Sequence, residues 1–225
     1  ISIEIKDQNL CPRYSCAVLE MKDALSDDRF LTPMDVFLAK AGMHGISKIV
    51  DITNYLMLEM GQPMHAFDSR KVEKIRIKRF DKPFVFQTLD GIDRNIDENT
   101  LMICNDNPPV AIAGIMGGLD SEIVEDTTTL TLESATFNAA SIRKSTVRLA
   151  HRTDASMRYE KCLDPEMTVP AIGRFVQLLT DIDPEAKVVS ALTDEYAYHY
   201  PQVTLDFDKA FIDKYTGIEI ANDTI

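Results

Sequence analysis

Helical and β-type patterns are segregated along this chain. From Lys74 to Phe137 the sequence consists of short β-type runs separated by turn residues, of which Asp90-Gly91 is the strongest turn signal. Apolar residues at helical spacing occur before this region and again after it. Strands and helices that do not alternate favour an α+β domain over a doubly wound parallel sheet.

Local signals predict where the individual elements lie. Thr32-Pro33 is a typical helix start, Ser47 can cap a second helix, and Asp164-Pro165 can start another. We expect helices over residues 33–41, 49–60, 139–150 and 165–179, with a short one after Thr153. We expect strands over residues 14–21, 76–80, 84–88, 101–104, 110–115 and 129–137.

The pattern restarts near Tyr200-Pro201. Val203–Leu205 looks like a strand, and residues 208–215 look like a helix that ends at Gly217. These elements are too few to fold alone. We therefore predict one domain over residues 1–200 and the start of a following domain over 201–225, which makes the chain a piece of a longer protein.

Composition narrows the function classes. The chain has 225 residues, a hydrophobic content of 45% and a formal net charge of −12. This size supports a substantial core, whereas an acidic domain should bind RNA poorly by itself because phosphate contacts dominate nucleic-acid affinity. The four cysteines form no CxxC pair and no zinc-ligand cluster with histidine. We therefore expect reduced thiols, a cytoplasmic location and no metal site; no apolar run has transmembrane length, so we expect no membrane partner.

Glycines gather in Ala113–Gly118, which reads AGIMGG. This spacing is not GxGxxG, and it is not a P-loop because no Lys-Ser/Thr pair follows. One interpretation is a tight turn that needs positive φ. The other is close approach of the backbone to a ligand, with free N–H groups as donors. The residues alone favour the tight turn.

Glu133 lies in the run TLTLESATF. Strand alternation places Leu130 and Leu132 on one face and Glu133 with Ala135 on the other. A carboxylate on a strand face is more often solvated than not. The alternative is a pocket acceptor for a hydroxyl or ammonium group, because an ionised carboxylate can only accept hydrogen bonds.

Three further features have both a structural and a functional interpretation. Thr153 in the string TDAS reads first as a helix cap, although its hydroxyl could also orient a water or a ribose hydroxyl. His65 in GQPMHAFD could be a core histidine or a polar group that lines a site. Residues 143–161 contain six basic side chains, which form either a charged helix surface or a phosphate-binding strip.

Several strings together resemble the editing domain of the bacterial phenylalanyl-tRNA synthetase beta chain. They occur in the family's order from about Leu10 to Leu179: CPRYSC, IVDITNYLMLEMGQPMHAFD, TLDG, AIAGIMGG, LESATF and HRTDASMRYEKCLDP. So many ordered matches are far more specific than a lone glycine motif. One departure is Lys161-Cys162-Leu163, where the family commonly has Arg-Gly-Val, at a position outside the expected pocket.

The resemblance implies a layered α+β module built around a β-sandwich, with helices packed on it. It also implies hydrolysis of tyrosine wrongly esterified to phenylalanine tRNA. Carried onto this sequence, Glu133 matches the glutamate that recognises the tyrosine phenol. The other matched positions are small or polar residues of the site: Gly114, Gly117, Ala155, Thr153, Thr53, Asn54 and His65.

No nucleophile–base pair is evident, so we expect a positioned water to attack the aminoacyl ester. Backbone N–H groups near Gly117 would stabilise the oxyanion, and Thr153 or His65 would orient the attack. The resemblance further implies an alpha subunit that bears the aminoacylation site, tRNA(Phe) as a partner and tyrosine as the editing substrate. It implies Mg²⁺ and ATP in the parent enzyme and no cofactor in this part. The alternatives are a non-catalytic module that docks on tRNA or a partner subunit, and a free-standing deacylase.

Overall fold

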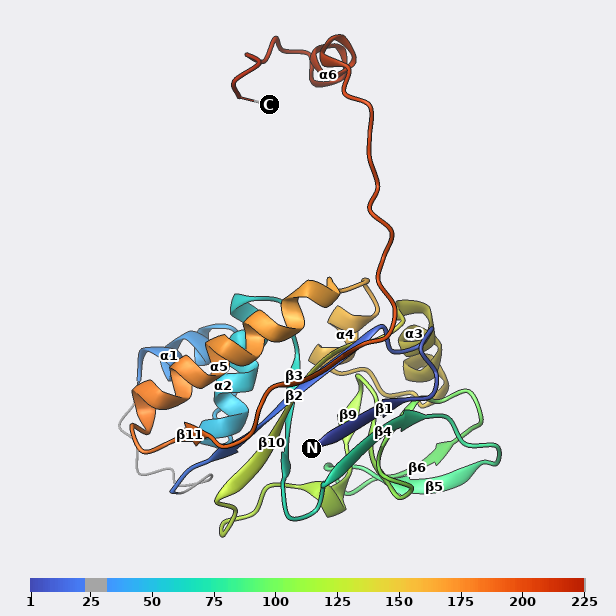
Figure 1. The fold of residues 1–225 in the computed structure, drawn as a ribbon, viewed down its shortest axis with the longest axis vertical. Helices are drawn as coiled ribbons and strands as arrows, with labels where there is room; N and C mark the ends of the chain where they lie inside the picture. Colours follow the sequence, from blue (N-terminus) through green and yellow to red (C-terminus); the bar gives the residue numbers. More distant parts are fainter. Residues whose placement is uncertain (23–31, 225) are drawn as a thin grey trace.

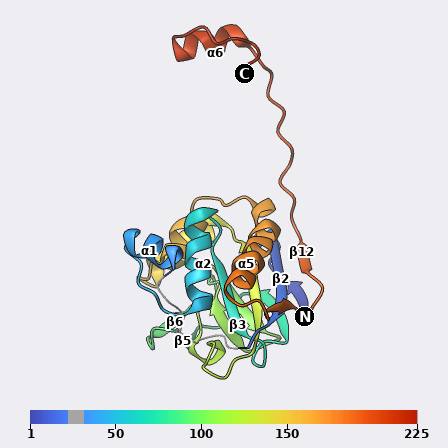
Figure 2. The ribbon, with the colours of Figure 1, turned by 90° about the vertical axis from the view of Figure 1, so that its left-hand side faces the viewer.

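A computed structural model of the chain describes residues 1–22 and 32–224. The described residues form three layers: a layer of helices, a central sheet and a second sheet (Figure 1). Turning the molecule shows α1, α2 and α5 on one side of the central sheet (Figure 2). The α+β class expected from the segregated sequence pattern is confirmed, and so is the layered arrangement that the resemblance implies.

The central sheet has the strand order β11-β2-β10-β3, and β12 also pairs with β2. All of these pairs are antiparallel. The strands are β2 (Arg13–Glu20), β3 (Met64–Asp68), β10 (Thr129–Thr136), β11 (Lys187–Val188) and β12 (Thr193–Tyr196). Because β10 lies between β2 and β3, both of its edges are paired. Helices pack on one of its faces and the second sheet packs on the other, and seven of its eight residues are buried.

The second sheet has the strand order β1-β4-β7-β8-β9. The β1–β4 pair is parallel and the other pairs are antiparallel. The strands are β1 (Ser2–Ile5), β4 (Lys74–Lys78), β7 (Met102–Asn105), β8 (Pro109–Ile112) and β9 (Met116–Gly117). A separate hairpin consists of β5 (Phe84–Gln87) and β6 (Asp93–Ile96), and Gly91 in its turn has the positive φ that the Asp-Gly signal predicts.

Two of the predicted capping signals start α-helices, whereas Asp164 caps a 3₁₀ turn and the α-helix after it begins only at Thr168. Thr32, Ser47 and Asp164 each accept a hydrogen bond from a backbone N–H of the first turn. The helices are α1 (Pro33–Lys40), α2 (Lys48–Glu59), α3 (Ala139–Arg148), α4 (Asp154–Tyr159), α5 (Thr168–Ile182) and α6 (Lys209–Thr216), with 3₁₀ turns η1 (Leu119–Ser121) and η2 (Pro165–Met167). Within the described ranges, no helix has the length and apolar content that crossing a membrane requires.

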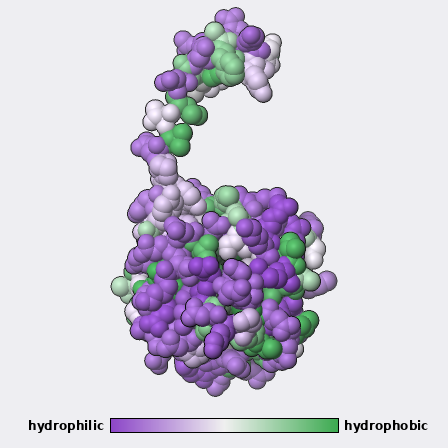
Figure 3. Space-filling view, turned by 90° about the vertical axis from the view of Figure 1, so that its right-hand side faces the viewer, coloured by the Kyte–Doolittle hydropathy of each residue, from purple (hydrophilic) through white to green (hydrophobic). Residues whose placement is uncertain are grey.

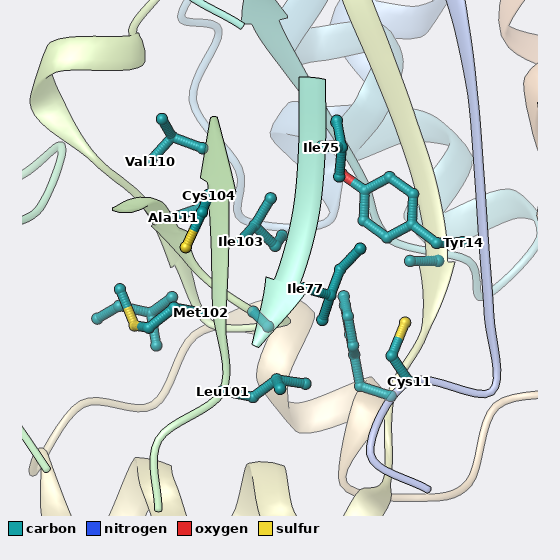
Figure 4. Close-up of a cluster of buried hydrophobic side chains, with 14 of the residues drawn as sticks. Cys11, Tyr14, Ile75, Ile77, Leu101, Met102, Ile103, Cys104, Val110 and Ala111 are labelled. Carbon is teal, nitrogen blue, oxygen red and sulfur yellow. The ribbon is translucent and has the colours of Figure 1, made fainter. Parts of the chain in front are cut away.

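Two hydrophobic cores lie on opposite faces of the central sheet. One core joins Leu130 and Leu132 of β10 to apolar residues of α2 and α5. The other joins Ala135 of β10 and Tyr14 of β2 to apolar residues of the second sheet. Figure 4 shows the Tyr14 ring beside Ile75 and Ile77 of β4. Sheet-on-sheet packing of this kind is the expected β-sandwich.

The residues after 200 differ from the sequence expectation in one element. The predicted strand Val203–Leu205 is wrong: it has no strand pairing, and Val203 and Leu205 are 74% and 83% exposed. A short β-type run cannot hold a strand conformation without a partner strand to take its backbone hydrogen bonds. The predicted helix is present as α6, ends at Gly217 with φ +75°, and lies apart from the layers (Figures 1 and 3).

Candidate functional site

The inner face of the central sheet carries a cluster of polar side chains from three strands. In the β10 register, Glu133 lies opposite Cys16 of β2 and opposite His65 of β3. Ala135 lies opposite Tyr14, two residues further along the same face. Since side chains of one face share the same alternation, Glu133, His65 and Tyr14 all point into the space between the two sheets.

Glu133 is almost completely buried, with 4% of its surface exposed. Its Oε2 atom accepts a hydrogen bond of 2.8 Å from the Tyr14 hydroxyl. Burial raises the pKa of Glu133 from its ordinary value of 4.5 to about 7, and the Tyr14 hydrogen bond opposes that rise. The interpretation of Glu133 as a solvated strand-face charge is therefore wrong, because the face that it occupies is covered by the second sheet.

Glu133 lines a small cavity between the sheets. Four other residues that the sequence singled out line the same cavity: His65, Gly114, Gly117 and Ala155. The cavity has about 70 Å³ of free space, several times the roughly 10–15 Å³ that one water needs on the same measure. The glycine turn, the β10 carboxylate and the TDAS string thus meet at one place, although they are distant from one another in the sequence.

Gly114 confirms the interpretation of the glycine motif as a tight turn, and close approach to a ligand stays a prediction. Its φ of +66° is a conformation that residues with a Cβ atom rarely adopt. A Cβ atom at this position would also lie 2.9 Å from Phe137 Cδ2 and 3.1 Å from Tyr159 Cδ2. The turn therefore needs glycine for its backbone, and the cavity wall needs glycine for lack of space.

Gly117 packs against the imidazole of His65. A Cβ atom at Gly117 would lie 2.7 Å from both Cε1 and Nε2 of that ring, so only glycine allows this contact. The Gly118 N–H donates to the Val110 carbonyl, and antiparallel alternation therefore places Gly117 at a position that forms no ladder bonds with β8. The N–H group of Gly117 therefore faces the edge of β9 that is turned away from β8. On that edge the Gly117 carbonyl accepts a hydrogen bond from the Leu89 N–H.

His65 is held in a form suited to accepting a hydrogen bond. Burial lowers its pKa from the ordinary value of 6.5 to about 4, so the ring is neutral at neutral pH. Phe67 contacts the ring edge-on, with centroids 4.5 Å apart. Neither ring nitrogen of His65 has a hydrogen-bond partner within residues 1–22 and 32–224.

Thr153 acts as a clamp on the site. Its hydroxyl caps α4 by accepting from the Ser156 N–H at 3.1 Å, and it donates to the Ile115 carbonyl at 2.9 Å. These bonds tie the start of α4 to the glycine turn and thereby place Ala155 in the cavity wall. Thr153 itself lines neither this cavity nor its neighbour, and its single hydroxyl hydrogen is already committed.

Thr53 and Asn54 belong to a second, larger cavity of about 370 Å³. Met64 and His65 line both cavities and form the wall between them. The Thr53 hydroxyl donates to the Val50 carbonyl of its own helix. The structure therefore places the predicted site residues in two adjoining compartments, with Glu133 in the smaller one and Asn54 in the larger one.

Sequence reasoning assigned no role to two aromatic residues of the site. Tyr14 lies in the quoted string CPRYSC and is the hydrogen-bond donor to Glu133. Tyr159 lies in the string that follows TDAS, lines the cavity, and donates its hydroxyl to the Pro63 carbonyl at 3.1 Å. The sequence gave no sign of these roles, since a tyrosine at strand or helix spacing looks like an ordinary core residue.

The basic run after β10 divides into paired and unpaired side chains. Arg148 pairs with Asp97, Arg152 pairs with Glu160, and Arg158 lies 3.8 Å from Asp154. Three side chains form no ion pair with any described residue: Arg143, Lys144 and Lys161. Both interpretations of the run stay open, because half of it is a charged helix surface and half offers free cations.

Metal-ligating residues do not gather in the described part of the chain. Within it, no group of three or more His, Cys, Asp or Glu side chains could hold an ion. The cysteines at positions 11, 16, 104 and 162 are all free thiols. Cys162, which stands where the resembled family commonly has glycine, has a φ of +62°, the conformation that glycine adopts most easily.

The chain is similar to a known domain family and to several known proteins. A model of the B3/4 domain family matches residues 10–184. The phenylalanine–tRNA ligase beta subunit of Clostridium acetobutylicum is 40% identical over 227 residues, which cover 99% of this chain and 28% of that protein. The beta subunit of Syntrophus aciditrophicus is 41% identical over 201 residues, which cover 87% of this chain and 24% of that protein.

The fold also matches a solved structure. An N-terminal fragment of the phenylalanyl-tRNA synthetase beta subunit from Pyrococcus horikoshii aligns with a TM-score of 0.54 and 12% identity. The alignment covers 99% of this chain and 61% of that fragment. At this identity the likeness concerns the fold alone. With most of its residues matched by the family model, the chain belongs to the B3/4 domain family.

Proposed function

We propose that this chain is the editing module of a phenylalanine–tRNA ligase beta subunit and hydrolyses tyrosine from mischarged tRNA(Phe). One observation carries the proposal: the buried Glu133 carboxylate lines a small cavity with one oxygen bonded to Tyr14. The other oxygen, Oε1, has no hydrogen-bond partner within the described residues. A buried acceptor with spare capacity suits a ligand that brings a hydroxyl into an otherwise apolar space.

The difference between tyrosine and phenylalanine is one hydroxyl, and the cavity is suited to test for it. A tyrosine phenol can donate to Glu133, whereas phenylalanine would leave the second oxygen of the buried carboxylate without a donor. A site built to bond a hydroxyl rejects the analogue without it by up to about 10⁴–10⁵. The opposite test, exclusion of a hydroxyl by an apolar pocket, discriminates only by roughly 10². A buried acceptor such as Glu133 is therefore better suited to selecting tyrosine for hydrolysis than to excluding it.

The hydrolytic step uses a water held by the His65 imidazole. The neutral imidazole accepts a hydrogen bond from the water, whose oxygen attacks the ester carbonyl carbon. The Gly117 N–H, which forms no ladder bond with β8, would stabilise the oxyanion. Collapse of the intermediate breaks the bond to the ribose oxygen, which takes up a proton from the water. The products are free tyrosine and tRNA with its terminal hydroxyl restored.

The second cavity suits the tRNA end of the ester. It adjoins the Glu133 cavity across Met64 and His65 and is several times larger. Thr53 and Asn54 supply polar groups there. On this proposal the amino acid side chain occupies the small cavity and the terminal ribose and base occupy the large one, which places the ester bond near His65.

The parent ligase would supply everything else that the reaction needs. The matched part is about a quarter of the relatives' length. On this proposal an alpha subunit with the aminoacylation site, tRNA(Phe) and Mg²⁺ with ATP belong to the whole enzyme in the cytoplasm. With a net charge of −12, this chain depends on that context for tRNA affinity.

The test is deacylation of tyrosyl-tRNA(Phe) by the intact ligase carrying Glu133→Ala. Loss of a hydrogen bond to a charged group corresponds to a fall of about 10- to 150-fold in kcat/KM. Hydrolysis of phenylalanyl-tRNA should not fall in parallel, so that discrimination is lost. Glu195→Ala is the matched control, because Glu195 is an exposed strand glutamate on β12. Unchanged tyrosyl-tRNA hydrolysis would refute the proposal, and altered subunit assembly instead would favour a docking module.

A further inference from the structure

Glu133 sits among neighbours that offer it very few donors. The groups that face it are Tyr14 and Cys16 from β2, Cys11 from the preceding loop, His65 from β3 and Tyr159 from α4. Burial raises the pKa values of both cysteine thiols and of Tyr159, so all three are uncharged at neutral pH. None of these groups is a cation that could balance the carboxylate.

Only one of these neighbours donates a hydrogen bond to the carboxylate within the described residues. The Tyr159 hydroxyl is directed to the Pro63 carbonyl, and the Cys11 thiol is directed to the Arg13 carbonyl. The Tyr14 hydroxyl donates to Glu133 Oε2. Tyr14 is itself fully buried among apolar residues of the second sheet and does not line the cavity, so its hydroxyl has no role in contacting a ligand directly.

We propose that Tyr14 is a positioning residue for Glu133: its hydroxyl holds one carboxylate oxygen in the core and so leaves the other as a single, fixed acceptor for the ligand hydroxyl. This inference rests on the proposed editing function. The substrate class is an aminoacyl ester whose side chain carries a hydroxyl at the far end of its ring. Without the Tyr14 bond the carboxylate could rotate, and two equivalent oxygens would then compete for one donor.

The same hydrogen bond favours the ionised form of the acceptor. Burial raises the pKa of Glu133 to about 7, and Tyr14 counters that effect. Removal of the hydroxyl therefore moves the pKa further upward. A protonated carboxyl group presents a donor as well as an acceptor, so it no longer selects strictly for a ligand that donates. At pH values below the pKa, each increase of one unit in the pKa lowers the ionised fraction about tenfold.

The experiment measures tyrosyl-tRNA(Phe) hydrolysis by the intact ligase between pH 6 and pH 9, with uncatalysed deacylation subtracted. If hydrolysis needs the ionised carboxylate, its rate should rise as the pH rises through the pKa of Glu133. For Tyr14→Phe we expect a loss of about tenfold near pH 6.5, recovery toward wild-type rates by pH 9, and a midpoint shifted upward. A merely structural role would lower the rate equally at every pH.

Two variants make the result specific. Tyr196→Phe is the matched control, because it removes a tyrosine–glutamate bond of the same length, 2.8 Å, to Glu166 on the outside of the sheet. It should leave the pH profile unchanged. In a Glu133→Gln background, Tyr14→Phe should cause no further loss of discrimination, since it acts through that carboxylate. Circular dichroism and the aminoacylation rate of the same preparations show whether each variant is folded.

The outcomes separate the two proposals. If Glu133→Gln abolishes discrimination and Tyr14→Phe shifts the pH profile, both stand. If Glu133→Gln abolishes discrimination but Tyr14→Phe changes nothing, or lowers the rate equally at all pH values, the positioning role is refuted and editing is not. If Glu133→Gln leaves discrimination intact, the editing proposal fails and the positioning role fails with it.

Discussion

The two faces of β10 carry out different tasks although they belong to the same eight residues. On the face toward α2 and α5, Leu130 and Leu132 are fully buried in a core of apolar side chains. On the face toward the second sheet, Glu133 is buried nearly as deeply beside Ala135. The first face stabilises the fold through apolar burial. The second face contains a carboxylate whose burial costs free energy.

On the proposed function, this comparison locates the place where the domain gives up stability for recognition of its ligand. Burial of an acceptor is favourable only if donors satisfy it, and Tyr14 satisfies one oxygen of Glu133. A sequence selected for stability alone would place another leucine or alanine at this position. The sandwich interior is therefore the region where substitution should reveal function, and the helix-facing core is the region where substitution should reveal stability alone.

The largest effect on stability is expected on the helix-facing side. Leu132→Ala should lower the free energy of unfolding by about 2–5 kcal/mol, because it leaves a cavity in a fully packed core. Denaturant unfolding measures the change, and Leu205→Ala, at an 83% exposed position, is the matched control. Tyrosyl-tRNA hydrolysis per folded ligase molecule should not change. A loss of hydrolysis greater than the loss of folded protein would break the distinction between the faces.

On the sandwich side, Glu133→Gln should change the pH dependence of stability. The pKa of Glu133 is raised from 4.5 to about 7 on folding, so its stability contribution is intact below pH 4.5 and is lost as pH rises through 7. The Glu133→Gln variant does not lose stability in this way, because its side chain does not ionise. Relative to wild type, its free energy of unfolding should therefore increase by up to about 3 kcal/mol between pH 4.5 and pH 8.

Urea unfolding at both pH values tests this prediction, with Glu195→Gln as the exposed control. His65 contributes an opposite trend, since its lowered pKa reduces stability as pH falls from 6.5 to about 4. That trend is common to wild type and variant and cancels in the difference. Equal pH dependence of the two proteins would mean that Glu133 is not the buried acid described above.

A smaller effect is expected at the clamp between α4 and the glycine turn. Thr153→Val removes the cap on Ser156 N–H and the bond to the Ile115 carbonyl, and should cost about 0.5–2 kcal/mol. Thr153→Ser keeps both bonds and should restore stability and hydrolysis together. If the valine variant loses hydrolysis with full stability, the hydroxyl acts in the reaction itself, as the alternative interpretation of Thr153 holds.

Elements with strong local signals could be predicted from the sequence. Thr32, Ser47 and Thr153 cap the helices that follow them, and β10 occupies nearly the predicted range. The sequence did not predict the strands β3, β6, β9, β11 and β12, because each is short and takes its conformation from pairing with a neighbour. The reverse error at Val203–Leu205 has the same cause, since a β-type run without a partner forms no strand.

The residues of the site could be predicted from the sequence, but their contacts with one another could not. The resemblance identified Glu133, Gly114, Gly117, Ala155 and His65, and the structure brings all of them to one cavity. Their roles in the reaction stay predictions. Tyr14 could not be assigned, because nothing in the sequence indicates that a residue 119 positions away donates to Glu133.

The sequence by itself determined the class of fold, the helix starts and the chemical types in the site, because these depend on local patterns and on residue identity. Only the tertiary structure decided that Glu133 is buried and not solvated, since alternation assigns a residue to a face but not what covers that face. It also decided the pairing of Glu133 with Tyr14. Both depend on strands and sheets that meet through long-range packing, where burial changes the free energy of a charge far more than any local preference does.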